Sequence, residues 1–406
     1  MIGCVMQREG TVMDVKIAAR ERFDSARSRV LELSHRIHAH PEIGFEEVKA
    51  AAWLSELLSG AGFDVTRGLC DLPTAFSAKA GNGPLRVALC AEYDALPGIG
   101  HACGHNIISA AAAGAGIALS AVADSVGLTV YVIGTPGEER GNAGGKILLL
   151  ERGAFDGIHA AMMVHPAPFD VLTPKIIAAS MFEVRYTGKE AHASSFPEMG
   201  INAADALTVA QTAIGLLRQH ILPTDRIHGI IVNGGEAANV IPAHTAARYI
   251  VRGETLADLE TLRPRVYRCF EAGALATGSK MEIVGGDKAY AEMIHNPEIA
   301  ALFKRNAEQL GRPFPDIGAA AHKSMASTDM GNVSHAIPSI HPMIGIDSMP
   351  AVNHQREFTA RCATDSADRA VCDGALAMAW TAIDLAGEGP LRDRLLSTGS
   401  GVAVRT

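Results

Sequence analysis

The sequence predicts an α/β fold in which a largely parallel sheet forms one domain and a smaller α+β domain is inserted into it. Apolar, strand-like runs alternate with helical segments up to about residue 165, which is typical of βαβ units around a parallel sheet. Between about 177 and 288 the order becomes β-α-β-β-α-β, as in a ferredoxin-like unit. A length of 406 residues also favours two domains over one core.

The first expected domain is discontinuous and covers residues 14–176 and 289–390. Its first helix has apolar residues on one side from about 14 to 38, and Pro41 ends it. A second helix runs from about 46 to 59 and stops at Gly60. The later elements are strands at 85–91, 128–134 and 160–164, and helices at about 106–123, 143–152, from 297 onward, and 365–386. Residues 1–13 and 391–406 are expected to be tails.

The inserted domain is expected at 177–288, as a lid that also forms a dimer. Its expected strands lie at 176–186, 227–233, 245–251 and 280–284, and its expected helices at 202–220 and 256–276. A small sheet of this kind has an edge that needs a partner, and such edges can pair between subunits.

Composition excludes several classes of protein. The formal net charge is −8 and the sequence has no dense Lys/Arg cluster, which argues against nucleic acid or an anionic membrane as partner. The uncharged run 107–123 is too short and too rich in Ala and Gly to cross a bilayer. Seven cysteines without a C-x-x-C pair argue against a disulfide framework. We therefore expect a cytoplasmic enzyme.

Potential metal ligands follow three successive strands. Residues Glu92, Asp94, Cys103 and His105 follow the first, Glu138 and Glu139 the second, and His165 the third. Ligands of open α/β sheets bind beyond the carboxyl ends of the strands, so these side chains are expected to converge. Each alone would be an ordinary surface or core residue, but together they indicate a site for Zn, Mn, Co or Ni. The roles of His101 and Glu92 stay open between ligand, support and neither.

Several longer motifs accompany this cluster. They are His38-Ala-His-Pro-Glu42, Cys103-Gly-His105-Asn106, Thr135-Pro-Gly-Glu138-Glu139, Gly188-Lys-Glu-Ala-His192-Ala, Asn239-Val-Ile-Pro242 and Asn353-His354-Gln-Arg-Glu-Phe358. In these motifs the chain resembles the aminoacylase/glutamate-carboxypeptidase family of dinuclear metallohydrolases (metallopeptidase family M-twenty). The resemblance is closest to the amidohydrolase branch, which includes p-aminobenzoyl-glutamate hydrolase, and to dipeptidase-like members.

The resemblance implies a role for each matching residue. Two divalent metal ions per chain would share the Cys103 thiolate, with Glu139 and His354 completing one site and His105 and His165 the other. Glu138 would be the general base, and Asp94 would support the ligands from behind. His192, Asn239 and Arg252 of the inserted domain would grip the substrate and stabilise the oxyanion, with His192 reaching the active site of the other subunit of a homodimer. For Arg252, a surface salt bridge is the alternative.

Two positions depart from the family pattern. Many members of the branch have Asp where this chain has Asn106, and classical carboxypeptidase members have His-x-Asp where this chain has Glu92-Tyr-Asp94.

The expected function is a metal-dependent amidohydrolase that uses a metal-activated water. Its substrate would be an N-acyl amino acid, an aroyl amino acid or a dipeptide with a free carboxylate. Glu138 and Glu139 cannot both do the same task, so one would bind metal and the other would shuttle protons. The alternatives are an aminopeptidase or carboxypeptidase acting on longer peptides, a non-catalytic metal-binding protein, and an amidase with Cys103 as nucleophile.

Overall fold

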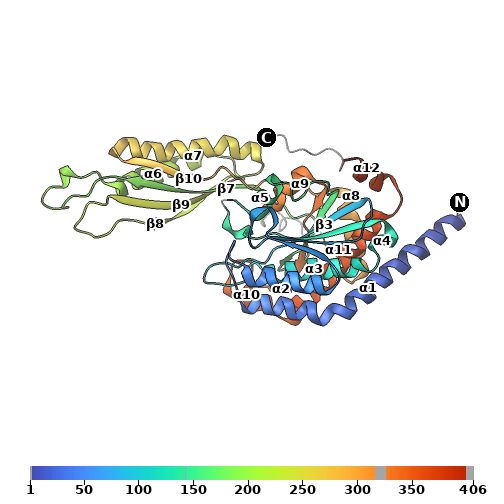
Figure 1. Cartoon of the computed structure of the whole chain (residues 1–406). Helices are drawn as coiled ribbons and strands as arrows, with labels where there is room; N and C mark the ends of the chain where they lie inside the picture. Colours follow the sequence, from blue (N-terminus) through green and yellow to red (C-terminus); the bar gives the residue numbers. More distant parts are fainter. Residues whose placement is uncertain (1, 142, 316–325, 399–406) are drawn as a thin grey trace.

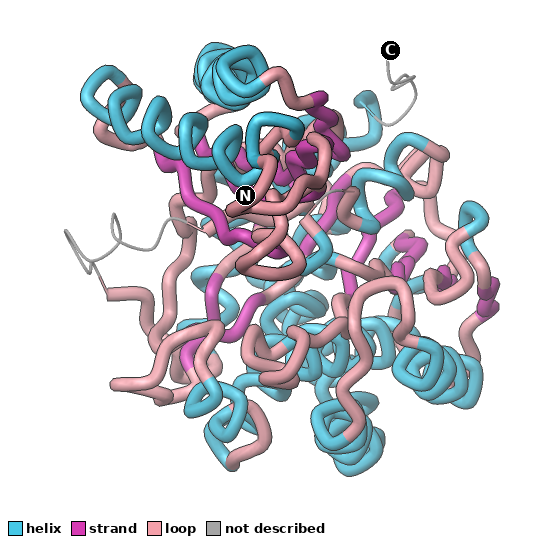
Figure 2. The backbone as a smooth tube through the Cα atoms, turned by 90° about the vertical axis from the view of Figure 1, so that its left-hand side faces the viewer, coloured by secondary structure: helices cyan, strands magenta, loops and turns pink. Residues whose placement is uncertain are grey.

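The chain forms a larger α/β domain from which a narrower inserted domain extends (Figure 1). The structure is a computed structural model that describes residues 2–141, 143–315 and 326–398. Figure 2 shows the molecule from the end of the inserted domain, with helices mostly along the outside and strands within.

A six-stranded sheet in the order β1-β2-β4-β3-β5-β11 forms the centre of the larger domain. Its strands are β1 (Asp64–Arg67), β2 (Phe76–Ala80), β3 (Leu85–Ala91), β4 (Leu128–Gly134), β5 (Ala160–Met162) and β11 (Ser339–Ile340). The pairs β4–β3, β3–β5 and β5–β11 are parallel, which confirms the largely parallel sheet. The edge strand β1 and its neighbour β2 pair antiparallel, and neither was expected from the sequence. A separate parallel pair joins β6 (His165–Ala167) and β12 (Met343–Gly345).

Helices pack on the sheet, and several of them pack against the central helix α3 (His105–Ser120). Residues 105–119 of α3 are all buried, and Gly114 lets the ring of Phe23 and the methyl group of Ala375 approach closely. Small side chains therefore allow this helix to lie between its neighbours. The other helices are α1 (Ile2–Ala39), α2 (Val48–Gly60), α4 (Ala123–Val126), α5 (Gly145–Glu151), α8 (Pro297–Gln309), α9 (Met330–Ala336), α10 (Arg356–Arg361), α11 (Asp365–Ala386) and α12 (Pro390–Thr398).

Helices extend into both segments expected to be tails, 1–13 and 391–406, of which residues 1 and 399–406 lie outside the described residues. Helix α1 already begins at Ile2, and no proline interrupts the sequence before Pro41. At the other end, Pro390 starts α12, where the missing N–H of proline costs no hydrogen bond, and the Leu395 side chain is buried. Among the described residues no single helix is long and apolar enough to cross a membrane. Only α11 and α12 taken together reach that composition, across an 88° bend.

The inserted domain has the expected β-α-β-β-α-β order. Its elements are β7 (Ala178–Thr187), α6 (Ala203–Leu217), β8 (Arg226–Asn233), β9 (His244–Gly253), α7 (Leu256–Thr277) and β10 (Lys280–Gly285). The antiparallel sheet has the order β10-β7-β9-β8. Alternate residues of β7, including Phe182, Val184 and Tyr186, join the core beneath α6 and α7. Strand β8 is an edge, and its Ile230 side chain is 64% exposed.

Short 3₁₀ turns complete the described elements, at Leu69–Asp71, Glu138–Arg140, Pro197–Met199 and Arg218–His220.

Candidate metal centre

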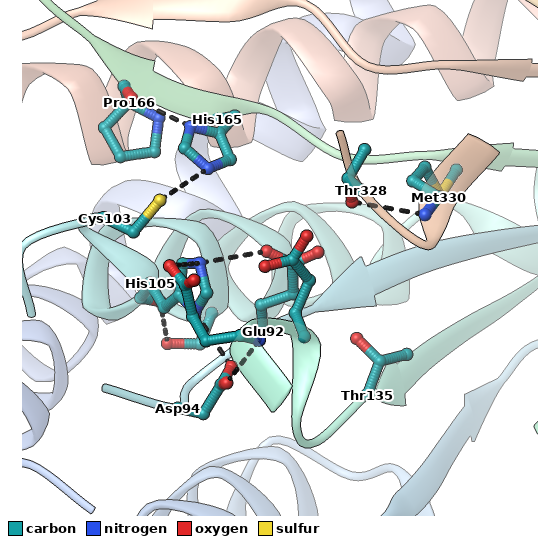
Figure 3. Close-up of polar contacts among 12 residues, drawn as sticks. Glu92, Asp94, Cys103, His105, Thr135, His165, Pro166, Thr328 and Met330 are labelled. Atoms are coloured by element: carbon teal, nitrogen blue, oxygen red, sulfur yellow. Dashed lines mark hydrogen bonds and ion pairs between the residues drawn. The ribbon is translucent and has the colours of Figure 1, made fainter. Parts of the chain in front are cut away.

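The segments that follow β3, β4 and β5 bring Cys103, His105, Glu139 and His165 together at one edge of the sheet, and His354 joins them from the loop between β12 and α10. Figure 3 shows Cys103, His105 and His165 of this cluster. Cys103 precedes α3 and His105 is its first residue, while His165 begins β6. Gly104 between them has φ 76°, and a Cβ there would lie 2.5 Å from Pro166 Cγ. Glycine is therefore needed for the Cys103 loop to approach the segment that carries His165.

The expected ligands form two groups that share Cys103. One contains Cys103, His105 and His165, and the other contains Cys103, Glu139 and His354, with the donor atoms of each group within 4.8 Å of one another. Cys103 Sγ lies 3.4 Å from His165 Nε2, and His354 Nε2 lies 3.3 Å from Glu139 Oε1. Two donors on one tetrahedral ion are about 3.3–3.6 Å apart at the usual Zn bond lengths. The spacing within each group therefore fits the donor atoms of a divalent ion.

Within the described part of the chain, each ligand group contains a buried polar atom without a hydrogen-bond partner. His105 Nε2 and Glu139 Oε1 are buried without a hydrogen-bond partner among the described residues. A buried donor or acceptor without a partner costs about 1–3 kcal/mol, so such atoms call for an explanation. Both atoms belong to the two ligand groups, and a bound cation would satisfy them.

Asp94 contacts two of the expected ligands at once. Its Oδ1 lies 2.9 Å from His105 Nδ1, and its Oδ2 accepts the Glu139 backbone N–H at 2.9 Å. Burial favours the protonated acid, but the neighbouring His105 and these hydrogen bonds outweigh it and hold the pKa of Asp94 below its usual value. A carboxylate behind a ligating imidazole sets its tautomer and leaves Nε2 free for a metal. Asp94 thus lies where support was expected.

The two neighbouring acids are placed in different surroundings. Glu139 lies with Cys103 and His354, whereas Glu138 lies with Glu92 and His105. Burial, then the charges of Glu92 and Glu139, raises the pKa of Glu138 well above its usual value. Two adjacent carboxyl groups in different environments are suited to different tasks.

Glu92 is held by a buried lysine that the sequence pattern did not single out. Lys146 Nζ donates to Glu92 Oε1 at 2.5 Å and to Asp329 Oδ1 at 2.6 Å, and all three residues are fully buried. The second oxygen of Glu92 lies 3.5 Å from His105 Nε2. Burial opposes the charge of Lys146, but the two carboxylates outweigh it and raise the pKa of the ammonium group.

His101 and Asn106 lie beside the site rather than in it. His101 is buried, stacks on His38 with ring centroids 6.3 Å apart, and belongs to none of the ligand groups found among the described residues. Asn106 donates to Ser34 Oγ and to the backbone oxygen of Cys362. The asparagine that departs from the family pattern therefore anchors α3 to its surroundings.

The ligand cluster opens into a cavity of ≈ 170 Å³. Arg252, at the end of β9, lines this cavity with Glu138, and its Nη1 donates to Ser327 Oγ at 2.6 Å. Ser327 and Asn353 also line it. The structure thus brings Arg252 to the site, where a guanidinium can bind both oxygens of a carboxylate.

His341 also lines the cavity and was missed by the sequence analysis. It follows β11, so a fourth parallel strand also ends at the site, and its ring stacks on His165 at 5.4 Å. A strand of two residues has no pattern that a sequence can reveal, whereas the buried Lys146 at the start of an apolar helix was a visible signal.

His192 and Asn239 are not brought to the metal cluster within one chain. They lie in the loops that follow β7 and β8, and both are exposed. In the β7–β9 register Ala178 pairs with Gly253 beside the larger domain, whereas Thr187 pairs with His244 at the far end (Figure 1). Both loops lie beyond that far end, where His192 bridges to Val240.

Comparison with known proteins identifies close relatives. A model of "Peptidase family M20/M25/M40" matches residues 88–368. The Xaa-Arg dipeptidase of Mus musculus is 38% identical over 387 residues, covering 91% of this chain and 89% of the relative. One of the subunits of p-aminobenzoyl-glutamate hydrolase from Escherichia coli (strain K12) is 33% identical, covering 72% of this chain and 65% of the relative.

A solved structure shares the fold over most of its length. The aminobenzoyl-glutamate utilization protein of Klebsiella pneumoniae superimposes with a TM-score of 0.71 at 19% identity, covering 89% of this chain and 97% of that one. This likeness supports the same arrangement of a larger domain and an inserted one.

Proposed function

The chain belongs to peptidase family M20/M25/M40, and we propose that it is a two-metal amidohydrolase of N-acyl or aroyl amino acids or dipeptides with a free carboxylate. The observation that carries this proposal is the pair of ligand groups that share Cys103 beside a separately placed Glu138. The family and its named relatives make the chain a hydrolase of amide bonds. The two-metal count and the substrate class are our inference.

Each residue has a chemical task in this proposal. Two divalent ions held by Cys103, Glu139, His354, His105 and His165 would supply a water of lowered pKa and polarise the scissile carbonyl. Glu138 takes the proton of that water and delivers it to the departing amine. Arg252 binds the substrate carboxylate from the other side of the cavity.

The donor set narrows the metal to four candidates. A thiolate, imidazoles and a carboxylate together suit Zn, Mn, Co or Ni better than the hard ions Mg and Ca. A shared thiolate also requires reduced cysteine. The six cysteines whose side chains the structure describes, Cys103 among them, are free, and on this chemistry we place the enzyme in the cytoplasm.

A small substrate is favoured over longer peptides. The cavity of ≈ 170 Å³ is smaller than the usual range of about 300–1,000 Å³ for ligand pockets. Arg252 at its wall suits the terminal carboxylate of such a substrate. The experiment that tests the function is an activity screen of N-acyl amino acids, aroyl amino acids and dipeptides on protein reconstituted with each of the four metals.

Glu138→Gln separates the remaining alternatives. We expect this variant to bind two metal ions per chain while kcat falls at least about 100-fold, the low end for loss of a general base. Metal content is measured by elemental analysis, and the exposed Glu198→Gln serves as control. Loss of metal with unchanged activity per bound ion would contradict the base assignment. Activity that survives chelation, or an acyl group trapped on Cys103, would favour the thiol amidase.

We further propose a homodimer in which the inserted domain, 177–288, is lid and contact surface, and 14–176 with 289–390 is the catalytic domain. The exposed apolar residues on the β8 edge, Ile230, Ile231 and Val232, support this arrangement. The distance of His192 and Asn239 from the metal cluster of their own chain supports action in the other subunit.

Subunit mixing tests the action of His192. The inactive variants His192→Ala and Glu138→Gln should regain activity when mixed and allowed to exchange subunits, because each mixed dimer then holds one site with both groups intact. Mixed dimers without recovered activity would exclude the role of His192 in the other subunit. A monomeric protein at the assay concentration would contradict the proposed dimer and, with it, the role of His192 in the other subunit.

A further inference from the structure

The turn that carries Glu138 and Glu139 is held by buried side chains from distant parts of the chain. Glu47 Oε1 accepts the Gly137 N–H at 2.8 Å, and Asp94 Oδ2 accepts the Glu139 N–H at 2.9 Å. Tyr290 Oη donates to the Glu138 carbonyl oxygen and accepts the Gly141 N–H. Four backbone groups of residues 137–141 are thus fixed by three side chains.

This turn cannot fix its own geometry. It is a single 3₁₀ turn, Glu138–Arg140, between Gly137 at φ 69° and Gly141 at φ 66°. Glycine in the left-handed region gives the turn its shape but adds conformational freedom. A single turn also lacks the repeated hydrogen bonds of a helix or a sheet. The position of the Glu138 carboxyl group therefore depends on the groups that hold the turn.

Among these groups Glu47 has no other assigned task. It directly precedes α2, is fully buried, and its Oε2 accepts the hydroxyl of Thr74 at 2.9 Å. Burial, then the nearby charge of Asp94, raises the pKa of its carboxyl group to about 7. Keeping an acid in such a place costs stability, which indicates that its hydrogen bonds serve a purpose.

The residues before Glu47 are shaped to the same turn. A Cβ on Gly44 would lie 2.8 Å from Gly137 Cα, and a Cβ on Gly137 would lie 2.7 Å from the ring of Phe45. Phe45 itself has φ 66°, a conformation that non-glycine residues rarely adopt. Segment 44–47 therefore lies in close contact with Gly137, and this segment precedes the part of the chain that the family model matches, 88–368.

We propose that Glu47 is a positioning residue for the reaction: by holding the Gly137 N–H it fixes the turn that aims the Glu138 carboxyl group at the reacting water. The inference rests on the proposed function for its kinetic consequence. Its structural part, that Glu47 orders residues 137–141, stands on the hydrogen bond and the burial alone.

The test compares Glu47→Ala and Glu47→Gln with Glu46→Gln. Glu46 is adjacent in sequence but exposed, so it is a matched control. For Glu47→Ala we expect kcat to fall about 10- to 100-fold, the effect of a displacement of about 1 Å, with KM within about twofold and metal content unchanged. Glu47→Gln should lose less, because its amide oxygen can still accept the Gly137 N–H.

Hydrogen exchange of the peptide that contains residues 137–141 gives a readout that needs no catalysis. We expect faster exchange there in Glu47→Ala, with peptides of α3 and the inserted domain unchanged. Unchanged exchange and unchanged kcat would overturn the proposal, as would a loss of kcat that tracks a loss of metal or of protection throughout the larger domain. If the wild-type protein hydrolyses none of the screened amides, the proposed function fails while the exchange result still decides the role of Glu47. If Glu47→Ala does not fold, kcat and the hydrogen exchange of residues 137–141 are both measured on Glu47→Gln.

Discussion

Replacing Lys146 by methionine should destabilise the larger domain by about 3–5 kcal/mol, the usual effect of breaking a buried ion pair. Its Nζ lies 2.5 Å from Glu92 Oε1 and 2.6 Å from Asp329 Oδ1, and all three side chains are fully buried. Methionine is of similar length, so the substitution removes the charge and its hydrogen bonds without opening a large cavity. What remains is two buried carboxylates without a cation.

Urea unfolding of the metal-stripped protein measures this effect at pH 8 and at pH 5. The control is Lys304→Met, because Lys304 pairs with Glu308 at 3.8 Å on the surface, where an ion pair contributes less than about 1 kcal/mol. Burial already raises the pKa of Asp329, and Lys146 opposes that rise. Without Lys146 the folded state holds protons more tightly than the unfolded state does. The loss of stability should therefore be largest at pH 8 and shrink towards pH 5.

A compensating variant checks the cause. Adding Glu92→Gln and Asp329→Asn to Lys146→Met removes all three buried charges, so part of the lost stability should return. A loss at pH 8 within about 1 kcal/mol of the Lys304→Met control, or one that is equal at both pH values, would refute the reasoning.

Three further predictions concern the site. Asp94→Asn should weaken the binding of at least one metal ion by about 10- to 100-fold, because His105 loses the carboxylate that orients it. Calorimetric titration measures the metal affinities, and values equal to those of the wild type would contradict this role. Arg252→Ala should raise KM about 10- to 100-fold for substrates with a free carboxylate but leave KM nearly unchanged for the matching carboxamides, because only a carboxylate pairs with the guanidinium. An equal rise in KM for both substrate classes would exclude a carboxylate contact. Dialysis against a chelator should abolish amide hydrolysis, and adding back a divalent ion should restore it. A colorimetric assay of amide hydrolysis measures both effects, and activity without metal would exclude the two-metal mechanism.

The sequence predicted elements with a clear local pattern and missed those without one. The apolar strands β3 and β4 and the long helix α11 lie at the expected residues, because burial imposes runs that can be read directly. The edge strand β1, of four mostly exposed residues, and β11, of two residues, carry no such pattern. Strand ends predicted which ligands meet, since parallel strands end on one side of a sheet.

Two long-range pairings that support the site could not be predicted, for a different reason. Lys146 meets Asp329 across 183 positions of sequence, and Glu47 meets Gly137 across 90. Nothing in the residues near either partner specifies such a pairing, because it arises only when the whole domain has formed. Arg252 could be predicted only in part, because the resemblance indicated its role but only the structure shows that it lines the cavity.

The pairing of β5 with β11 bears on how the chain reaches its native state. Met162 lies beside Ile340, and between them in sequence lies the whole inserted domain. Closing so long a loop is entropically costly, and non-local parallel pairing is slow to form. The contacts of the inserted domain are nearer in sequence, and its entry and exit lie together where Ala179 pairs with Tyr290. If the inserted domain folds first, it brings the two ends of the chain segment between β5 and β11 close together. The loop that must then close for β11 to pair with β5 is much shorter. Pulse-labelled exchange during refolding should then show protection in β7–β10 before β5, and the reverse order would mean that the larger domain assembles without this help.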